Sequence, residues 1–326
     1  MPRSTISRIF ASISARNGAS GVLVSNRGTG IPRKIEARKF SRARALGLCM
    51  NKPQLIVAAA IAAALVTAAP AAAAPTWAPA GTATVHPGVQ TVSDSGQCTS
   101  NFIFFDGANN VYVGQAAHCT STGGQTSTNG CDTGSLPLGS PVEVDGASRP
   151  GTLAYNSWLA MQAAGETDEN TCAYNDLALV KLDPADYAKV NPSIPFWGGP
   201  TGITDTTNTG DKVLSYGNSS LRFGVSKLSP KQGVVVQGQG NGWSRDVYTA
   251  TPGIPGDSGS GFMDDSGRAI GVLSTVQIAP LAGSNGVGDL RSEVNWMHAH
   301  SSFSGVQLVN GTEAFNPDLV GAIGGA

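Results

Sequence analysis

Short hydrophobic runs separated by polar, turn-rich segments dominate the chain from about residue 100 onward. Short apolar runs that are bounded by Gly, Asn, Asp and Ser are typical of β-strands. The better strand candidates are 101–105, 111–113, 141–144, 177–182, 212–216, 233–237, 246–249 and 269–274. Helical patterns are few between them, so the sequence predicts an all-β sandwich or barrel fold.

One helix is expected near the C-terminal end of the chain. Leu290, Val294 and Met297 recur at helical spacing, and Asp289 just before them is a suitable N-cap. The whole chain has 326 residues, of which 40% are hydrophobic and 13% are charged. This composition allows one or two domains with a sizeable buried core.

The N-terminal part of the chain has the pattern of a targeting segment. Residues 55–66 form an apolar, alanine-rich run with Lys52 before it and Pro70 after it. We expect a secretory signal peptide over 50–73, which leaves a mature chain from residue 74. A transmembrane helix is the alternative, but Pro70 and its small neighbours shorten the span. Residues 1–49 are interpreted as an upstream extension, or else as a long basic n-region.

Charge is distributed very unevenly between the leader and the remainder. Residues 1–53 hold 11 of the 21 Lys and Arg residues and a single acid, Glu36, which leaves ten basic and 21 acidic residues beyond. An acidic mature chain without a basic stripe would repel a phosphate backbone, so nucleic acid is not an expected partner. From the signal segment we expect a secreted, extracellular protein with no stable membrane insertion after signal cleavage. We also expect it to be a monomer.

Four cysteines follow the signal segment: Cys98, Cys119, Cys131 and Cys172. An even number of cysteines in an exported chain suggests disulfides, and four cysteines allow three pairings. Zinc is a poor alternative, because there is no Cys-x-x-Cys pair and the thiols would have to stay reduced outside the cell. The sequence thus predicts no metal site and no cofactor.

Three short segments carry the candidate chemistry. Residues 256–261 read Gly-Asp-Ser-Gly-Ser-Gly, which places Ser258 between glycines on a tight turn. Such a cluster alone is often only a turn or linker. However, His118 lies upstream in an Ala-Ala-His-Cys block, and Asp176 begins an Asp-Leu-Ala-Leu block. These three residue types in one chain suggest nucleophilic catalysis.

In sequence and order, the Ala-Ala-His-Cys, Asp-Leu-Ala-Leu and Gly-Asp-Ser-Gly blocks resemble the catalytic blocks of the chymotrypsin/trypsin-like serine proteases. The C-terminal region, 285–315, also resembles secreted actinobacterial members, so the similarity runs from about residue 90 to the end. The resemblance implies two six-stranded antiparallel β-barrels with the active cleft between them. We place the first barrel at about 90–191 and the second at about 211–326, joined through a Pro/Gly/Thr-rich connection. The resemblance also favours a disulfide between Cys98 and Cys119, which would leave Cys131 to pair with Cys172.

Within this resemblance, each triad residue has a distinct role. Ser258 would be the nucleophile, since a hydroxyl of high pKa needs a positioned base to lose its proton. His118 would be that base, because an ordinary imidazole titrates near pH 6.5, at about neutrality. Asp176 would hold the imidazole in the correct tautomer and stabilise its cation.

The turn around Ser258 is expected to supply the remaining catalytic groups. The N–H groups of Gly256 and Ser258 should form an oxyanion hole. Asp257 between them is interpreted as structural, paired with a cation as in the family. No Ile-Val-Gly-Gly activation sequence precedes Cys98, so one of the ten remaining basic residues is the expected partner of Asp257.

Substrate contacts are predicted for Ser274 and Pro252. The resemblance assigns Ser274 to the strand that supports the aspartate and pairs with substrate, although Thr275 and Val276 depart from the family pattern there. Pro252 stands where trypsin-like members place the carboxylate that binds Lys or Arg, and Leu273 where glutamate-specific members place a histidine. These positions predict a small or apolar residue on the acyl side of the cleaved bond.

The sequence therefore predicts a secreted serine endopeptidase that cleaves proteins or peptides through an acyl-enzyme. A catalytically inactive binding module with a protease fold is the first alternative, and a surface-anchored structural protein is the second. A lipase is disfavoured, because its nucleophile elbow requires glycine where this chain has Ser260. The pair His298 and His300 is interpreted as solvated, since no third metal ligand is evident.

Overall fold

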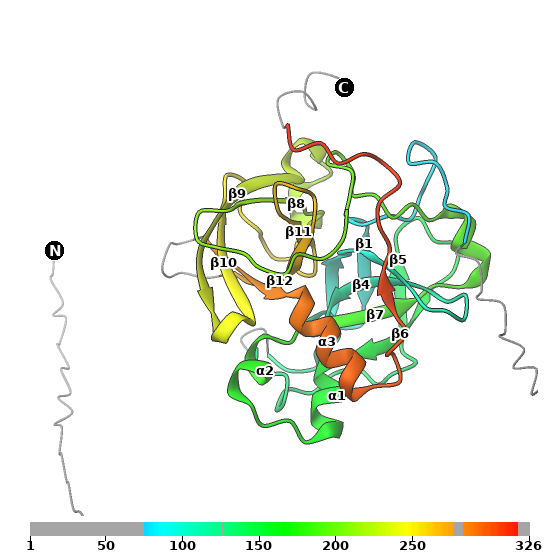
Figure 1. Ribbon diagram of the computed structural model, residues 1–326. Coiled ribbons are helices and arrows are strands. Elements are labelled where there is room, and N and C mark those ends of the chain that lie inside the picture. The colour runs from blue at the N-terminus through cyan, green and yellow to red at the C-terminus, as the bar shows by residue number, and fades with distance from the viewer. Residues whose placement is uncertain (1–74, 125–126, 277–282, 319–326) are drawn as a thin grey trace, which may run out of the picture. The chain divides into compact units, whose positions relative to one another are not determined.

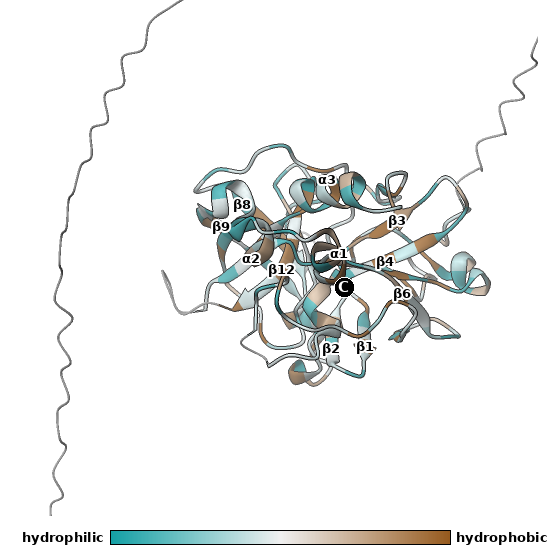
Figure 2. Cartoon of the chain, turned by 90° about the horizontal axis from the view of Figure 1, so that it is seen from below, coloured by the Kyte–Doolittle hydropathy of each residue, from teal (hydrophilic) through white to brown (hydrophobic). Residues whose placement is uncertain are grey.

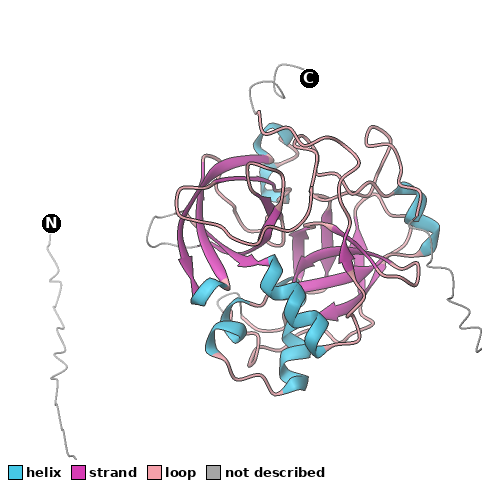
Figure 3. Cartoon of the chain, viewed as in Figure 1, coloured by secondary structure: helices cyan, strands magenta, loops and turns pink. Residues whose placement is uncertain are grey.

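The computed structural model describes residues 75–124, 127–276 and 283–318. Both the proposed extension at 1–49 and the proposed signal peptide at 50–73 lie outside the described residues. The described part is mostly β-structure with a C-terminal helix, which confirms the predicted fold class. Figure 3 shows its strands gathered in two groups. None of the helices in the described ranges has the length and apolar character that crossing a bilayer requires.

The first sheet has eight antiparallel strands in the order β14-β3-β4-β7-β6-β5-β1-β2. Their bounds are β1 (Gln90–Ser93), β2 (Gly96–Thr99), β3 (Ile103–Phe105), β4 (Val111–Ala116), β5 (Pro141–Val144), β6 (Gly151–Asn156), β7 (Leu177–Lys181) and β14 (Gln307–Leu308). This sheet curls into a half-barrel and differs from the closed six-stranded barrel implied by the resemblance. Its edge strand β2 does not pair with β14; instead, the N–H of Thr99 donates to the carbonyl of Ser258, 2.8 Å away. The open edge therefore contacts the serine turn.

The second sheet is a closed barrel in the order β10-β13-β12-β11-β8-β9 (Figure 1). Its strands are β8 (Lys212–Tyr216), β9 (Pro230–Gln239), β10 (Ser244–Thr249), β11 (Gly261–Met263), β12 (Ala269–Val276) and β13 (Asn285–Asp289). Seven buried apolar side chains form one core cluster of these strands: Val213, Val235, Val247, Phe262, Ile270, Leu273 and Val287. Closure leaves this sheet without an exposed edge.

In the described residues, three α-helices accompany the sheets: α1 (Ser157–Ala164), α2 (Glu169–Tyr174) and α3 (Leu290–His300). The expected C-terminal helix is α3, and its N-cap Asp289 accepts a hydrogen bond from the N–H of Ser292 at 2.8 Å. The sequence analysis did not predict α1 and α2, which have eight and six residues. Such segments are too short for apolar periodicity to separate a helix from a strand. The cap signals of α1 are nevertheless present, Asn156 before it and Gly165 after it.

Helix α3 packs against residues of both sheets. Its buried Leu290 and Met297 belong to one apolar cluster with Phe102 and Tyr112 of the first sheet region and Val272 of the barrel. Apolar residues are concentrated along inner strands such as β3 and β12 (Figure 2). Burial of this area is the main favourable contribution to folding. The helix thereby joins the two sheets through a shared core.

The part of the chain that the structure describes has two disulfides, Cys98–Cys119 and Cys131–Cys172, the pairing that the resemblance favours. The first joins β2 to the 3-10 turn Ala117–Thr120, which follows β4. The second joins a loop to α2. Two disulfides in a chain of this kind are typical of exported proteins.

We expect that replacing both Cys131 and Cys172 with alanine lowers the free energy of unfolding by about 4 kcal/mol, from the chain entropy released in the unfolded state. The magnitude follows from the sequence separation of 41 residues between the two cysteines. Urea unfolding followed by tryptophan fluorescence measures the change. Equal midpoints for the parent and double variant would contradict the prediction.

Candidate active site

His118 and Asp176 come together because their strands pair. His118 lies in the 3-10 turn directly after β4, and Asp176 directly precedes β7. The register places Ala116 at the end of β4 opposite Leu177 at the start of β7. The side chains of His118 and Asp176 therefore meet beside these strand ends. Asp176 Oδ2 lies 2.7 Å from His118 Nδ1, while Oδ1 accepts the backbone N–H of His118 at 2.9 Å.

The carboxylate of Asp176 has a third partner, in addition to its two bonds with His118. Ser274 on β12 donates its hydroxyl to Oδ2 at 2.6 Å. Asp176 is only 3% exposed, so it depends on these donors instead of water. The barrel strand β12 thus contributes directly to fixing an aspartate of the first sheet, as the resemblance implies for Ser274.

Two opposing effects act on the pKa of His118. Burial lowers the pKa, because it disfavours the imidazolium, whereas the charge of Asp176 and its hydrogen bond raise it. Burial is the largest single effect, but the charge and the hydrogen bond of Asp176 together outweigh it, and the pKa lies above the ordinary value. The imidazole side chain remains 25% exposed, so protons and substrate can reach it.

Hydrolysis is therefore expected to fall at low pH with a midpoint above about 6.5. Only neutral His118 can accept a proton, and its raised pKa means that protonation sets in at a higher pH than for a free imidazole. Asp176→Asn removes the charge that raises the pKa, so the residual activity should have its midpoint at lower pH. The measurement is kcat/KM against pH. A midpoint below that of free imidazole in the parent protein would contradict this assignment.

Ser258 lies on a turn that packs against the ends of β2 and β4. The carbonyl of Ser258 accepts from Thr99, and the N–H of Gly259 donates to the carbonyl of Leu273 at 2.7 Å. Gly259 has a φ of +88°, and a Cβ there would lie 2.9 Å from the backbone nitrogen of Ala116. Glycine is required by this close approach. The turn is thereby held against the residues that precede His118.

Within the described ranges, Ser258 Oγ makes no hydrogen bond to His118. Catalytic hydrogen bonds are often long in a free enzyme and tighten when substrate binds. Ser258 is half-buried, in contrast to Ser260, which is fully buried and donates to the carbonyl of Asp257 at 2.8 Å. Of the two serines in this turn, Ser258 is thus the one that a substrate can reach.

The two proposed oxyanion donors flank the turn. Gly256 has a φ of +93°, and its carbonyl accepts from Gln97 Nε2 at 2.9 Å and Thr99 Oγ1 at 2.8 Å. Among the described residues, the N–H groups of Gly256 and Ser258 have no acceptor. Two backbone donors without partners, one on each side of Asp257, are the groups that an oxyanion hole requires.

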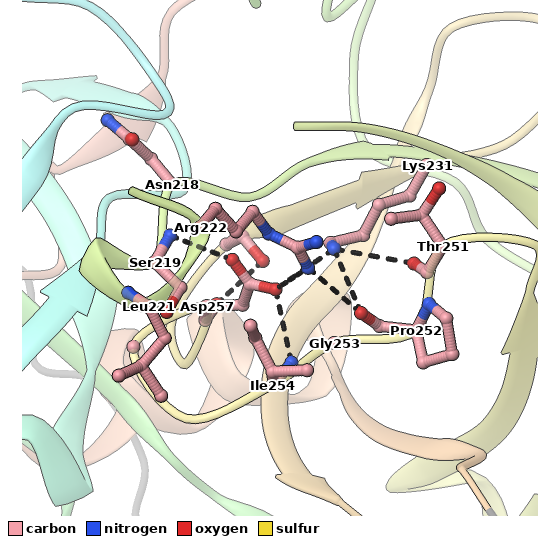
Figure 4. Close-up of polar contacts among 12 residues, drawn as sticks. Asn218, Ser219, Leu221, Arg222, Lys231, Thr251, Pro252, Gly253, Ile254 and Asp257 are labelled. Carbon is pink, nitrogen blue, oxygen red and sulfur yellow. Dashed lines mark hydrogen bonds and ion pairs between the residues drawn. The ribbon is translucent and has the colours of Figure 1, made fainter. Parts of the chain in front are cut away.

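Asp257 is fully buried and pairs with two cations (Figure 4). Its Oδ2 lies 2.5 Å from Arg222 Nη2 and 2.9 Å from Lys231 Nζ, and Oδ1 accepts the N–H of Ser219 at 3.0 Å. The sequence analysis expected one basic partner, and the structure has two. Burial raises the pKa of Asp257, but Arg222 and Lys231 outweigh it and hold the pKa below the ordinary range. Burial lowers the pKa of Lys231, and the charge and hydrogen bond of Asp257 partly offset this lowering.

The same cations contact the proposed substrate pocket. The carbonyl of Pro252 accepts from Arg222 Nη2 at 2.9 Å and from Lys231 Nζ at 3.3 Å (Figure 4). Next to it, the N–H of Gly253 donates to Asn285 Oδ1 at 2.8 Å. Arg222, Lys231 and Asn285 were not predicted. Arg222 and Lys231 lie on segments without a motif, and Asn285 begins the 285–315 region without any mark of a role at the site, so packing brings all three to the serine turn.

Two groups contain histidine, one with His298 and His300 and one with His118 beside Cys98 and Cys119, and neither fits a metal site. His298 Nε2 lies 2.7 Å from the carbonyl of Val306, and His300 stacks on Trp296. Within the described residues, His118 also lies near Cys98 and Cys119, with the possible ligand atoms within 4.8 Å of one another. Because those two cysteines form a disulfide, they offer no thiolate to a metal.

No protein-family model matches the chain, and no curated protein matches it in sequence. Among the solved structures that resemble it are chymotrypsin-like serine proteases of bacteria. Thermobifida fusca Protease A has 16% identity and a TM-score of 0.44, with 70% of this chain and 99% of that chain covered. The Nocardiopsis protease has 14% identity and a TM-score of 0.42, with 69% and 98% covered. The Cellulomonas bogoriensis chymotrypsin has 17% identity and a TM-score of 0.42, with 69% and 98% covered.

Proposed function

We propose that the chain is a secreted serine endopeptidase. The observation that carries this proposal is the bonded set His118, Asp176 and Ser274 beside a turn that presents Ser258. Asp176 is held by three donors, and in turn it orients the imidazole and favours its protonated form. A purely structural histidine would not need a buried carboxylate at Nδ1 together with an exposed ring edge.

In the proposed reaction, Ser258 Oγ attacks the peptide carbonyl carbon while its proton passes to His118 Nε2. The negative charge that develops on the carbonyl oxygen is stabilised by the N–H groups of Gly256 and Ser258. His118 then gives the proton to the leaving amine as the C–N bond breaks, which leaves an acyl-enzyme. Water attacks the acyl-enzyme with His118 again as the base, and the acid product leaves Ser258 free.

The substrate is proposed to be a protein or peptide with a small or apolar side chain on the acyl side of the cut. At the Pro252 carbonyl, the two cations Arg222 and Lys231 share a single carboxylate, that of Asp257, which supports rejection of a basic substrate side chain. Mass spectrometry of a mixed peptide library after incubation tests this. Cleavage mainly after Lys, Arg or Glu would contradict the pocket assignment, and no cleavage would contradict the peptidase proposal.

A further inference from the structure

Glu293 is a fully buried acid on the first turn of α3. Its side chain contacts the backbone of Asp176, the proposed catalytic aspartate. Its Oε1 accepts the backbone N–H of Asp176 at 2.9 Å, a hydrogen bond that spans 117 residues of sequence. Space for this oxygen exists because position 288 is glycine: a Cβ there would lie 2.7 Å from Oε1. No motif in the sequence marks Glu293, and the proposed reaction does not use it.

We propose that Glu293 is a positioning residue, which anchors the backbone of Asp176 through an uncharged carboxyl group and so keeps His118 in its catalytic orientation. This inference rests on the proposed serine protease function. It extends the site from the three triad residues and Ser274 to the C-terminal helix. The side chain does not touch the substrate and is not a catalytic residue.

The surroundings of Glu293 disfavour its ionised form. Within the described residues, no Lys, Arg or His forms an ion pair with it, and a buried unpaired carboxylate is very costly. The titratable groups that face it are Asp176 before β7, Asp289 at the end of β13 and Tyr155 on β6. Asp289 is itself paired with Arg245 at 3.0 Å. The other elements packed on α3, helix α1 and strand β12, carry no charged residue.

These groups together raise the pKa of Glu293 well above its ordinary value. Burial is the largest cause, and the charges of Asp176 and Asp289 add to it; the hydrogen bond from Asp176 opposes them without prevailing. With no cation beside the buried side chain, the proposal assigns it the uncharged form. Since Oε1 is the acceptor, the proton would reside on Oε2, which is buried and has no hydrogen-bond partner among the described residues.

A neutral acceptor has an advantage at this position. The carboxylate oxygens of Asp176 are held by His118 and Ser274, and its backbone is held by Glu293, so both ends of the residue are fixed. An ionised glutamate would fix the backbone equally well. However, its charge would raise the pKa of His118 further and make less neutral base available near pH 7.

Three variants test the proposal. Glu293→Gln keeps an uncharged acceptor, so kcat/KM should stay within about threefold and the acid limb of the pH profile should not move, because one hydrogen bond replaces another. Glu293→Leu has a similar volume but no acceptor, and it should lower kcat about tenfold with KM unchanged, because a buried N–H is left without a partner. Glu143→Gln, at an exposed position on β5, is the matched control and should behave as the parent.

Each outcome decides the question. Rescue by Gln with loss in Leu supports the proposal. An acid limb that shifts to lower pH in Glu293→Gln shows that the parent carried a charge there, and full activity in Glu293→Leu shows that the anchor is unnecessary; either result overturns it. Where the leucine variant does not fold, the pH profile of the glutamine variant alone decides. Failure of the proposed function is seen separately, as an absence of hydrolysis in the parent protein.

Discussion

Replacing Ser258 with alanine is expected to reduce peptide hydrolysis by about 10⁶-fold, and replacing His118 with alanine by a similar factor. The double variant should lose little more than either single variant. The reason is that nucleophile and base act as one unit: without the base the hydroxyl keeps its proton, and without the hydroxyl the base has no proton to accept. Initial rates with a peptide ester and a peptide amide measure both effects.

Two controls show whether the loss of hydrolysis comes from the catalytic groups or from unfolding. Thermal unfolding should show that the variants remain folded, since both side chains are partly exposed and neither belongs to the apolar core. Ser266→Ala, in an exposed turn, is the matched serine control and should keep full activity. Losses that add in the double variant would mean that the two residues do not share one reaction.

Asp257→Asn is expected to lower the free energy of unfolding by about 3–5 kcal/mol, because it removes the counter-charge of two buried cations. Lys231 is fully buried and Arg222 is 8% exposed, so neither can recover its hydration without moving. The same change should nearly abolish hydrolysis, since Asp257 lies between the two oxyanion donors and accepts the N–H groups of Ser219 and Ile254. Urea unfolding and hydrolysis rates provide the two readouts.

The stability difference should also depend on pH in a fixed direction. The folded-state pKa of Asp257 is depressed, so its contribution is fully present above the unfolded value of about 3.9 and is lost as pH falls through the folded value. The parent and variant should therefore converge only in strong acid. Arg149→Met, which breaks an exposed pair with Asp183, is the control and should leave stability unchanged within error. A loss no larger than that of the control would contradict the buried-cluster interpretation.

Local signals in the sequence were sufficient to predict eight strands and the last helix, whereas β1, β2, β6, β11, β13 and β14 were missed. Alternating apolar runs such as 212–216 became β8 with the same bounds, and the cap and spacing around Asp289 located α3. The open first sheet was not predictable in this way. Closure requires the edge strands β2 and β14 to pair with each other. Here Thr99 of β2 instead donates a hydrogen bond to the serine turn.

Some residues of the candidate site could also be predicted from the sequence, and others could not. His118, Asp176 and Ser258 lie in short blocks whose residue types suggest chemistry, so they could be named from the sequence. Arg222 and Lys231 could not, because the sequence does not distinguish among the ten basic residues and only packing selects these two as partners of Asp257. Glu293 has the sequence context of an ordinary helix residue. Its importance follows from a burial and a contact across 117 positions, which no local pattern encodes.

The most direct test of the proposed function is covalent labelling of the folded protein with a serine-directed fluorophosphonate. Attack by Ser258 Oγ on phosphorus expels fluoride and leaves one phosphonyl group, which intact mass and peptide mapping locate. If Ser258 is an activated nucleophile, the parent protein should gain a single group on Ser258, and His118→Ala or prior denaturation should abolish the reaction. A folded parent protein that stays unlabelled, or that is labelled on another serine, would contradict the assignment and favour a protease-fold binding module.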